Sequence, residues 1–408
     1  MAKEIIVGLD VGTTKICVIV GEVSEDHRID IIGVGTHPSH GLKKGMVVNI
    51  ESTVESIHKA VDEAELMAGV QIEAVYTGIA GGHIRGFNSR GVIAVKTHEV
   101  TRADIARAIE TAKAVQIPDD REILHVIPQE FIVDAQDGIK DPLGMSGVRL
   151  EADVHIITGA VTAAQNIEKS IHRAGLRRVD MVLQPLASSE AVLTLEEKEM
   201  GVAMVDIGGG TTDLAIFVDG NVRHSAVIAI GGHHFTNDIA IGLRTPPAEA
   251  EKIKIKYGCA DIEKVRETEM LEVPGIGGRP SRTLSRQVLC EIIQPRAEEV
   301  FALVSQEIEK MGYQEKITSG AVITGGMASM PGMMEVAERM IACPSRIGRP
   351  TGVGGLIDVV YNPMYATGVG LLLYAVRNRD KTEVRQAGTG QVFVRIRHWM
   401  REWMKEFF

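Results

Sequence analysis

The segment Val205-Asp206-Ile207-Gly208-Gly209-Gly210-Thr211-Thr212-Asp213 places an acidic residue, three glycines and two threonines between two apolar runs. A second segment near the amino terminus, Gly8-Leu9-Asp10-Val11-Gly12-Thr13-Thr14-Lys15, repeats this design. The apolar runs on either side are typical of buried strands. Each segment is therefore predicted to be a strand, a turn rich in glycine and threonine, and a second strand.

Turns of this composition suit a phosphate ligand. Glycines let the backbone approach a phosphate and direct its N–H groups toward it, while threonine hydroxyls add hydrogen-bond donors. A carboxylate at the end of the first strand can hold a hydrated Mg²⁺ that contacts the phosphate. A single such loop is also typical of an ordinary hairpin turn. Two loops of one design in the same chain instead predict a pair that closes on a polyphosphate from opposite sides.

Composition limits the class of protein. A chain of 408 residues exceeds what one core usually supports, so two or more domains are expected. The net charge of −10 argues against a nucleic-acid partner. The four cysteines form no Cys-x-x-Cys pair, which favours a reduced cytoplasm without disulfides or a zinc site. No apolar run is long enough to span a bilayer, so any membrane contact is expected to be peripheral.

The pattern between the two loops changes at about residue 83. Three strands, a helix over residues 50–67 and a strand over residues 74–79 are expected first. From about His83 to Thr158, strands alternate with a helix capped at Thr101, which predicts a compact α+β insertion. Further along, a long helix is expected over residues 285–311, followed by a strand and a glycine loop at Ala321–Ala328. That loop permits close packing against a flat ligand, but an ordinary strand-to-helix turn explains it equally well.

Five motifs together resemble a known superfamily. They occur in the order of the actin/Hsp70/sugar-kinase fold, as its phosphate 1, connect 1, phosphate 2, adenosine and connect 2 motifs: Asp10–Thr14, Pro185–Ser189, Asp206–Asp213, Thr324–Ala328 and Tyr365–Leu371. More narrowly, the chain resembles the FtsA family of bacterial cell division proteins. That resemblance extends nearly from end to end, through the segments Glu65–Ala68, His125–Glu130, Ser146–Arg149 and Gly277–Pro280 and through the carboxyl-terminal tail.

The resemblance implies an α/β, actin-like fold, that is, a duplicated ribonuclease-H-like fold with an inserted α+β subdomain 1C and a carboxyl-terminal amphipathic helix. The expected boundaries are 1–82, 161–198 and 362–376 for subdomain 1A, 83–160 for subdomain 1C, 199–233 and 319–361 for subdomain 2A, 234–318 for subdomain 2B, 377–391 for a linker and 392–408 for the terminal helix. In the family, subdomain 1C contacts the next subunit of a filament.

The same resemblance assigns a site for ATP and Mg²⁺. Asp10 and Asp206 would hold the metal through water, and Lys15 would be the counter-charge to phosphate. The residues expected to line the phosphates are Gly12, Thr13, Thr14, Gly208, Gly209, Gly210 and Thr211. Glu251 and Lys254 would face the ribose and adenine beside Gly325, Gly326 and Met327. A solvated ion pair between Glu251 and Lys254 is an equal alternative.

Hydrolysis requires a group that positions water, and the candidate is Gln184, just before the connect 1 helix. A glutamine is a poor general base but can orient water. Turnover in the family is generally weak, so ATP is interpreted as a switch for assembly with at most slow hydrolysis. A packing or capping role for Gln184 is favoured over a catalytic one.

The carboxyl-terminal tail has a separate design. A polar, glycine-containing linker is followed by residues 391–408, which form an amphipathic pattern if helical. At ~100° per residue the large apolar side chains fall within an arc of roughly 140°. They are Val392, Phe393, Ile396, Trp399, Met400, Trp403, Met404 and Phe407. Arg395, Arg397, His398, Arg401, Glu402, Lys405 and Glu406 occupy the remainder.

Three interpretations of this stripe compete: packing on the body, binding in a partner's groove, or lying in a membrane interface. The membrane is favoured, because a terminal helix behind a linker with so many large apolar side chains is costly to leave in water. Its membrane contacts would come from Ile396, Trp399, Met400, Trp403, Met404 and Phe407. One such helix binds weakly, and assembly would multiply the attachment.

The expected function is therefore an ATP-binding, actin-like division protein that polymerises on the cytoplasmic face of the inner membrane at the division site. In the family the polymer anchors the tubulin-like FtsZ, whose carboxyl-terminal peptide docks on subdomain 2B, and it helps to recruit later division proteins. Arg282 and Arg296 are candidate contacts for FtsZ, although solvated surface charges are the alternative. The main rivals are a metabolite kinase of the same fold and a pilus-assembly ATP-binding protein.

Overall fold

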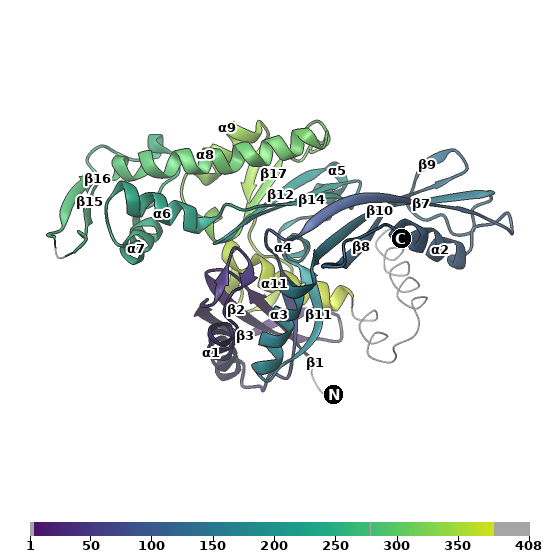
Figure 1. Ribbon diagram of the computed structural model, residues 1–408, viewed down its shortest axis with the longest axis horizontal. Coiled ribbons are helices and arrows are strands. Elements are labelled where there is room, and N and C mark those ends of the chain that lie inside the picture. Colours follow the sequence, from purple (N-terminus) through teal and green to yellow (C-terminus); the bar gives the residue numbers. More distant parts are fainter. Residues whose placement is uncertain (1–3, 278, 379–408) are drawn as a thin grey trace.

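The computed structural model describes residues 4–277 and 279–378. It consists of two halves built on related sheets, with a third, smaller sheet projecting to one side (Figure 1). The duplicated α/β architecture and the α+β insertion expected from the sequence are confirmed. The tail residues expected to contact the membrane, from Ile396 to Phe407, lie outside the described residues.

The first sheet has the strand order β11-β6-β1-β2-β3-β19. Three antiparallel strands form its centre, and β6 and β11 run parallel to β1. Its strands are β1 Glu4–Val11, β2 Lys15–Val23, β3 Ile29–Pro38, β6 Ala74–Ile79, β11 Arg177–Leu183 and β19 Gly354–Gly355. A short hairpin, β4 Leu42–Lys43 and β5 Met46–Val47, follows β3. Strand β11 was missed from the sequence, because charged residues interrupt its apolar pattern.

The second sheet, β14-β13-β12-β17-β18, repeats this topology with an antiparallel meander and two parallel strands. Its strands are β12 Val202–Ile207, β13 Thr212–Val218, β14 Asn221–Ile228, β17 Ala321–Thr324 and β18 Ser345–Ile347. Alternate residues of β12 enter different cores: Met204 joins the core shared with the first half, whereas Val205 packs toward the helices outside. Because both faces of β12 are buried, its sequence is an almost continuous apolar run and does not alternate with polar residues.

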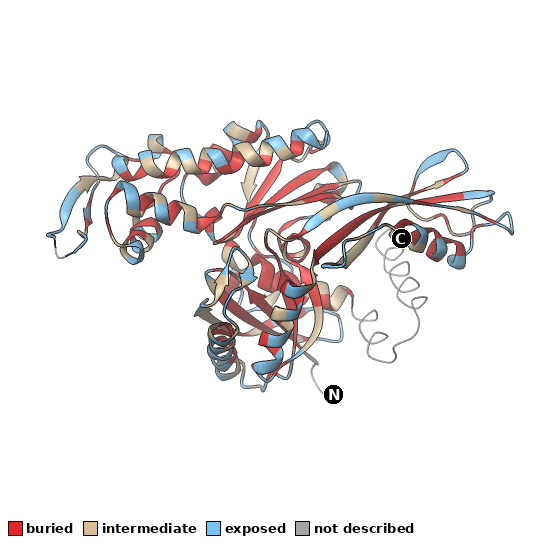
Figure 2. Ribbon diagram, viewed as in Figure 1, coloured by how far each residue is buried: buried red, intermediate tan, exposed pale blue. Residues whose placement is uncertain are grey.

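Helices cover both sheets (Figure 2). On the first half these are α1 Ile50–Ala68, α3 Val161–Arg173, α11 Ala366–Arg377 and the short α10 Ile357–Val360, whose Val360 enters the first core. Helix α4 Gln184–Val192 contacts both sheets, and α5 Leu195–Met200 packs on β13 of the second half. The other helices of the second half are α6 Gly232–Gly242, α7 Pro247–Tyr257, α8 Arg286–Lys310 and α9 Met333–Ile341. Short 3₁₀ turns are η1 Ile262–Lys264, η2 Gly326–Ser329 and η3 Pro363–Tyr365, and β15 Met270–Val273 pairs with β16 Arg282–Ser285. The predicted end of α1 at Gly69 is confirmed, since Gly69 adopts a left-handed conformation and donates to Glu65 O.

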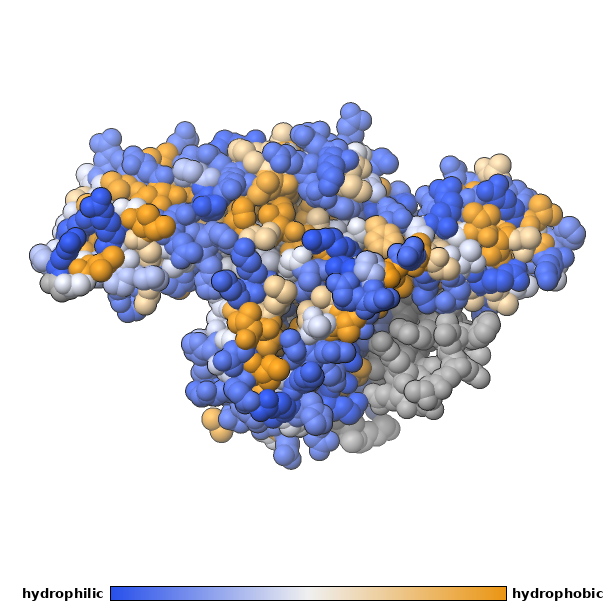
Figure 3. Space-filling model, viewed as in Figure 1, coloured by the Kyte–Doolittle hydropathy of each residue, from blue (hydrophilic) through white to orange (hydrophobic). Residues whose placement is uncertain are grey.

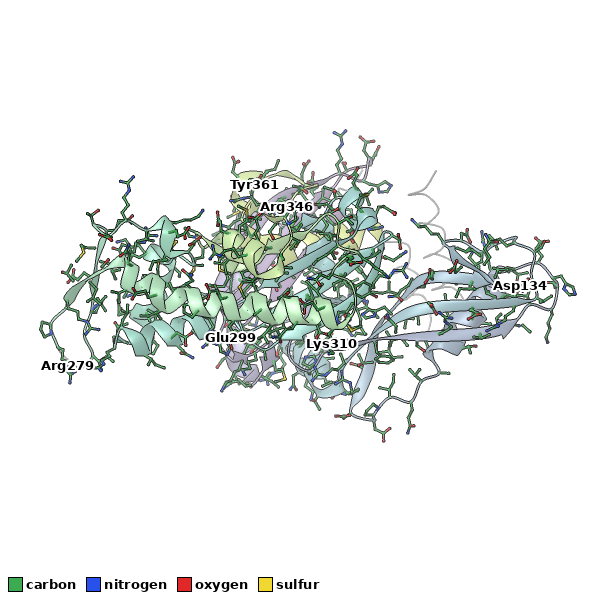
Figure 4. All side chains as sticks on the ribbon, turned by 90° about the horizontal axis from the view of Figure 1, so that it is seen from above. Asp134, Arg279, Glu299, Lys310, Arg346 and Tyr361 are labelled. Atoms are coloured by element: carbon green, nitrogen blue, oxygen red, sulfur yellow. The ribbon has the colours of Figure 1, made fainter. Side chains whose placement is uncertain are left out.

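The insertion is an antiparallel sheet of order β7-β10-β8-β9 with one helix packed on it. Its elements are β7 Arg85–Ala94, α2 Arg102–Lys113, β8 Arg121–Val133, β9 Gln136–Ile139 and β10 Arg149–Ala160. The predicted cap at Thr101 is present as a capping box with Asp104. The insertion extends away from both halves, and Asp134 at its tip lies opposite Arg279 at the far end of the molecule (Figure 4).

The insertion also contacts the second half along β14. Gln129 Nε2 donates to Val222 O at 2.9 Å, and Asn221 Nδ2 donates to Gln129 O at 3.1 Å. His155 is fully buried here, and burial lowers its pKa to about 3, with His224 adding to the shift. The neutral ring lies between Asn88 Oδ1 and Ser225 Oγ. Because the amide oxygen only accepts, His155 Nδ1 carries the proton and Nε2 accepts from Ser225.

Helices α4 and α11 cross at close range between the two sheets. A Cβ built on Gly370 would lie 1.8 Å from Ala187 O, so only glycine fits there without displacing backbone. A Cβ built on Gly368 would meet side-chain atoms and no backbone, the nearest being Ile19 Cδ1 at 2.7 Å and Ile19 Cγ1 at 3.2 Å. The crossing distance of the two helices therefore depends on Gly370.

Gly370→Ala should destabilise the protein by about 1–3 kcal/mol, because backbone must move to admit the methyl group. Gly368→Ala is the matched control in the same helix, and it should cost less since a side chain can rotate away. Urea unfolding of both variants measures the difference. Equal stability of the two variants would contradict the close crossing.

Candidate functional site

The two glycine loops face one another across a cavity between the halves. They are related by an offset of 196 residues, which superposes Asp10 on Asp206 and Gly12 on Gly208 in sequence. Each loop is closed by the same hydrogen bond, from Gly12 N to Lys15 O at 3.0 Å and from Gly208 N to Thr211 O at 2.9 Å. The predicted pairing of the loops is thus present in the geometry of the fold.

The loops touch each other directly. A Cβ built on Gly209 would lie 2.5 Å from Thr14 Cγ2, and one on Gly210 would lie 2.8 Å from Thr13 Oγ1. Gly45, in the hairpin between β4 and β5, donates its N–H to Thr13 Oγ1 at 3.0 Å. Gly45 was not predicted, and only its place in a turn after β3 could have suggested it.

Most of the predicted nucleotide residues line this one cavity. They are Asp10, Gly12, Thr13, Thr14, Lys15, Gln184, Asp206, Gly208, Gly209, Gly210, Thr211, Gly325 and Gly326. Unpredicted lining residues include Gly45, Asp213, Met364 and Thr367. The structure therefore brings together the loops of both halves, the start of α4 and the glycine loop after β17.

Three buried carboxylates approach this cavity. Burial raises the pKa of Asp10 to about 6, an effect that Lys15 opposes and Asp206 reinforces. Burial likewise raises the pKa of Asp206, although the hydroxyl of Ser188 and the charge of Lys15 act against it. For Asp213, burial and then Asp206 raise the pKa to about 7. The cavity thus favours binding of a cation that would compensate these charges.

Asp213 is the least satisfied of the three. Thr211 Oγ1 donates to its Oδ2 at 3.0 Å, while its Oδ1 is buried without a hydrogen-bond partner among the described residues. The sequence analysis quoted Asp213 within the loop but gave it no role. The equivalent residue of the first loop, 196 positions earlier, is Cys17. Because only the second loop carries a carboxylate at this position, the comparison of the two loops could have singled out Asp213.

Lys15 and Gln184 are oriented by specific partners. Lys15 Nζ donates to Met364 O at 2.8 Å and lies 4.3 Å from the centre of the Tyr365 ring. Gln184 Nε2 donates to Asp10 Oδ1 at 3.0 Å. Gln184 is the first residue of α4, yet its side chain binds a carboxylate across the cavity instead of capping the helix.

Of the residues assigned to adenosine, Gly325 and Gly326 line the cavity, whereas Glu251, Lys254 and Met327 lie outside its lining. Lys254 is 7% exposed, and its Nζ donates to Glu251 Oε2 at 2.7 Å and to Thr236 Oγ1 at 2.8 Å. Glu251 and Lys254 do form the ion pair that the alternative interpretation expected. Lys254 is not solvated, however, so the expectation of a solvated pair is wrong. Met327 is buried, and its sulfur would lie 3.1 Å from a Cβ on Gly232.

Arg282 and Arg296 lie away from the cavity, on β16 and α8. Arg296 Nε donates to Asp238 Oδ2 at 2.6 Å, and its Nη1 pairs with Glu299. Arg282 is exposed, and its guanidinium donates to Leu243 O. The two arginines therefore differ: carboxylates of the chain itself neutralise Arg296, whereas Arg282 has no carboxylate partner among the described residues.

Comparison with known proteins gives the family. A family model described as "Cell division protein FtsA" matches residues 203–370, and one described as "SHS2 domain inserted in FTSA" matches residues 81–158. The chain is 53% identical to the cell division protein FtsA of Pseudomonas aeruginosa over 92% of this chain and 90% of that protein. It is 43% identical to the FtsA of Escherichia coli K12 over 99% of both chains. The chain belongs to the FtsA family of cell division proteins.

More distant solved structures share the fold of this FtsA-family chain. The pilus-biogenesis PilM–PilN complex superposes with a TM-score of 0.65 at 17% identity, covering 91% of this chain and 98% of that one. MreB5 of Spiroplasma citri bound to ADP superposes with a TM-score of 0.57 at 14% identity, covering 94% and 99%. Within the described residues, no helix of the FtsA-family chain has the length and apolar character needed to cross a membrane.

Asp213 should make the stability of the ligand-free protein depend on pH. Its folded-state pKa of about 7 exceeds the ordinary value of 3.8. Between these values the folded state holds a proton that the unfolded state has released, so the free energy of unfolding falls as pH rises. Asp213→Asn should flatten this fall and raise Tm at about pH 8 relative to the wild type.

Thermal melts at several pH values between the two pKa values measure this effect. Asp26→Asn, at an exposed carboxylate in the turn after β2, is the control for a change of one charge. A pH profile of Asp213→Asn that follows the wild type would show that Asp213 is not the group that titrates.

Proposed function

We propose that this chain is an ATP-dependent division protein that assembles on the cytoplasmic face of the inner membrane at the division site and anchors FtsZ there. The observation that carries the proposal is the meeting of two equivalent glycine loops, each with its own buried aspartate, in one cavity between the halves. A polyphosphate bound in such a cavity would contact both halves at once. Binding can therefore be converted into a change of shape and assembly.

The residues around the cavity fit Mg-ATP. The N–H groups of the loops with Gly12 and Gly209 would cradle the phosphates, and Lys15 is close enough to exchange Met364 O for a phosphate oxygen. Asp10 and Asp206 would hold the Mg²⁺ through water, and the unpartnered Oδ1 of Asp213 adds to the negative field that favours it. The bound ion would neutralise charge on the phosphates.

The adenosine would lie beyond the phosphates, between Gly325–Gly326 and the Glu251–Lys254 pair of α7, near Met327. Lys254 already donates to Gly232 O at the start of α6. The buried cluster therefore connects α6 to α7. One side of the Glu251–Lys254 pair would face the base and ribose. Recognition at this side would distinguish ATP from free polyphosphate.

Hydrolysis is assigned a secondary role. Gln184 lies beside Asp10 and can orient a water molecule, but an amide cannot accept its proton at neutral pH. Slow turnover would then act as a reset of the assembled state. Binding as the main role and slow hydrolysis as the secondary one fit a nucleotide switch. Neither role requires a second substrate in the cavity.

Assembly and membrane attachment involve parts of the chain outside the cavity. The insertion at residues 83–160 projects from the body and is the proposed contact with the next subunit (Figure 1). The tail at 392–408 is the proposed lipid anchor, and many tails on one polymer would bind together far more tightly than one. Later division proteins would be recruited to this assembled array.

Pelleting with phosphatidylglycerol-containing vesicles tests the proposal. ATP and Mg²⁺ should increase the pelleted fraction several-fold, and Trp403→Glu should abolish most of it by placing a charge in the apolar arc. His398→Glu introduces the same charge on the polar side of the arc and should reduce pelleting much less. Failure to co-sediment with both the vesicles and the FtsZ carboxyl-terminal peptide would favour a kinase of the same fold or a pilus-assembly ATP-binding protein.

FtsZ is proposed to dock on the lobe that contains α6, α7, α8 and the β15–β16 hairpin. Apolar side chains gather on that lobe (Figure 3), and the most exposed are Ile241, Ile255, Met270 and Ile276. Arg282 lies on β16 of the same lobe. An extended peptide with apolar and acidic side chains would find both kinds of partner here.

Arg282→Ala should weaken binding of the FtsZ carboxyl-terminal peptide by about tenfold, equivalent to ~1.4 kcal/mol. Arg296→Ala should cost less, because Asp238 and Glu299 already neutralise Arg296. Fluorescence anisotropy of a labelled peptide measures both affinities, with Lys316→Ala, on the exposed loop after α8, as the control. A larger loss at Arg296 than at Arg282 would reverse the assignment.

A further inference from the structure

Helix α4 holds the metal-site carboxylates of both halves. Gln184 Nε2 donates to Asp10 Oδ1 at 3.0 Å, and Ser188 Oγ donates to Asp206 Oδ2 at 2.7 Å. Because the two donors are four residues apart, they lie on one face of the helix, one turn from each other. The spacing of a single helical turn therefore sets where the two carboxylates are fixed relative to each other.

A second helix completes the contact with Asp206. Thr367 Oγ1 of α11 lies 3.0 Å from Ser188 Oγ. Ser188 has one hydroxyl proton, which goes to Asp206, so Thr367 is the donor in the contact between the two hydroxyls. Thr367 also lies near enough to Asp206 to favour its ionised form. All three residues are buried, and Ser188 is fully inaccessible to solvent.

This chain of hydroxyls sits where α4 and α11 cross. Ser188 follows Ala187, whose carbonyl oxygen lies against Gly370, and Thr367 precedes Gly370 by one turn of α11. A shift of one helix along the other would therefore separate the two hydroxyls. Ser188, which is inaccessible to water, would then lose the donor that supports its own hydrogen bond to Asp206.

We propose that Ser188 and Thr367 are positioning residues that couple metal binding at Asp206 to the crossing of α4 and α11. The inference rests on the proposed function, since it concerns the Mg²⁺ that accompanies ATP. A metal ion that requires ionised Asp206 stabilises the arrangement in which Ser188 donates to Asp206 and Thr367 donates to Ser188. By reciprocity, the crossed arrangement raises the affinity for the ion.

Thr367→Val keeps the shape of the side chain and removes its donor. The variant should bind ATP about tenfold more weakly in the presence of Mg²⁺, as loss of an outer partner of a metal ligand typically does. Its affinity for ATP in EDTA should stay within about twofold of the wild type, because no donor to phosphate is lost. Titration calorimetry under the two conditions gives both values.

The Mg²⁺ dependence is a readout that packing alone would not change. At a fixed ATP concentration, Thr367→Val should need about tenfold more Mg²⁺ for half-maximal binding. Thr367→Ser restores a hydroxyl and should return both the affinity and this Mg²⁺ midpoint toward the wild type.

Ser188→Ala and Ser189→Ala form a matched pair. Ser189 is adjacent on α4 and equally buried, but its Oγ donates at 2.7 Å to Leu186 O. Only Ser188→Ala should reduce the Mg²⁺-dependent affinity. Equal effects of the two variants, or failure of Thr367→Ser to recover binding, would overturn the inference and assign the hydroxyls to helix packing.

The outcomes separate this inference from the proposed function. Wild-type protein that binds no ATP with Mg²⁺ would refute the function itself. Wild-type binding that Thr367→Val leaves unchanged in both Mg²⁺ and EDTA would refute only the coupling. Melting curves of the ligand-free variants establish that each is folded before binding is measured.

Discussion

Three carboxylates buried at the junction of the two halves are the constraint on which the site depends. Burial raises the pKa of Asp10, Asp206 and Asp213, and the charge of Asp206 adds to the rise at the other two. Lys15 opposes the rise at Asp10 and at Asp206. Such an arrangement is stable only if donors are fixed in place around it. The two crossing helices, their close approach at Gly370 and the paired loops all serve to hold those donors.

Much of this was predictable from the sequence because it is encoded by spacing. The repeated order of strand, turn and strand predicted two equivalent loops, and the loops do line one cavity. The alternation within β10 and the cap at Thr101 likewise located the insertion. Patterns of this kind follow from the periods of strands and helices, so they survive without knowledge of the tertiary fold.

The contacts between elements were not predictable in this way. Ser188 and Thr367 were quoted within motifs, but nothing in either motif shows that their hydroxyls meet at 3.0 Å. The burial of Lys254 and the pairing of Arg296 with Asp238 depend on residues far away in the sequence. Strand β11 was missed because the parallel position beside β6 compensates for a pattern that is weak on its own.

The insertion is held at two places that belong to different halves. Its ends continue the first half through Ile84 and Ala160, while Gln129 and His155 bind β14 of the second half. A rotation of one half against the other would therefore act on both attachments of the insertion. Because Asp134 lies at the end of the insertion (Figure 4), the same rotation would displace it further than residues near the attachments. The length of β8 and β10 would set the ratio of these two displacements.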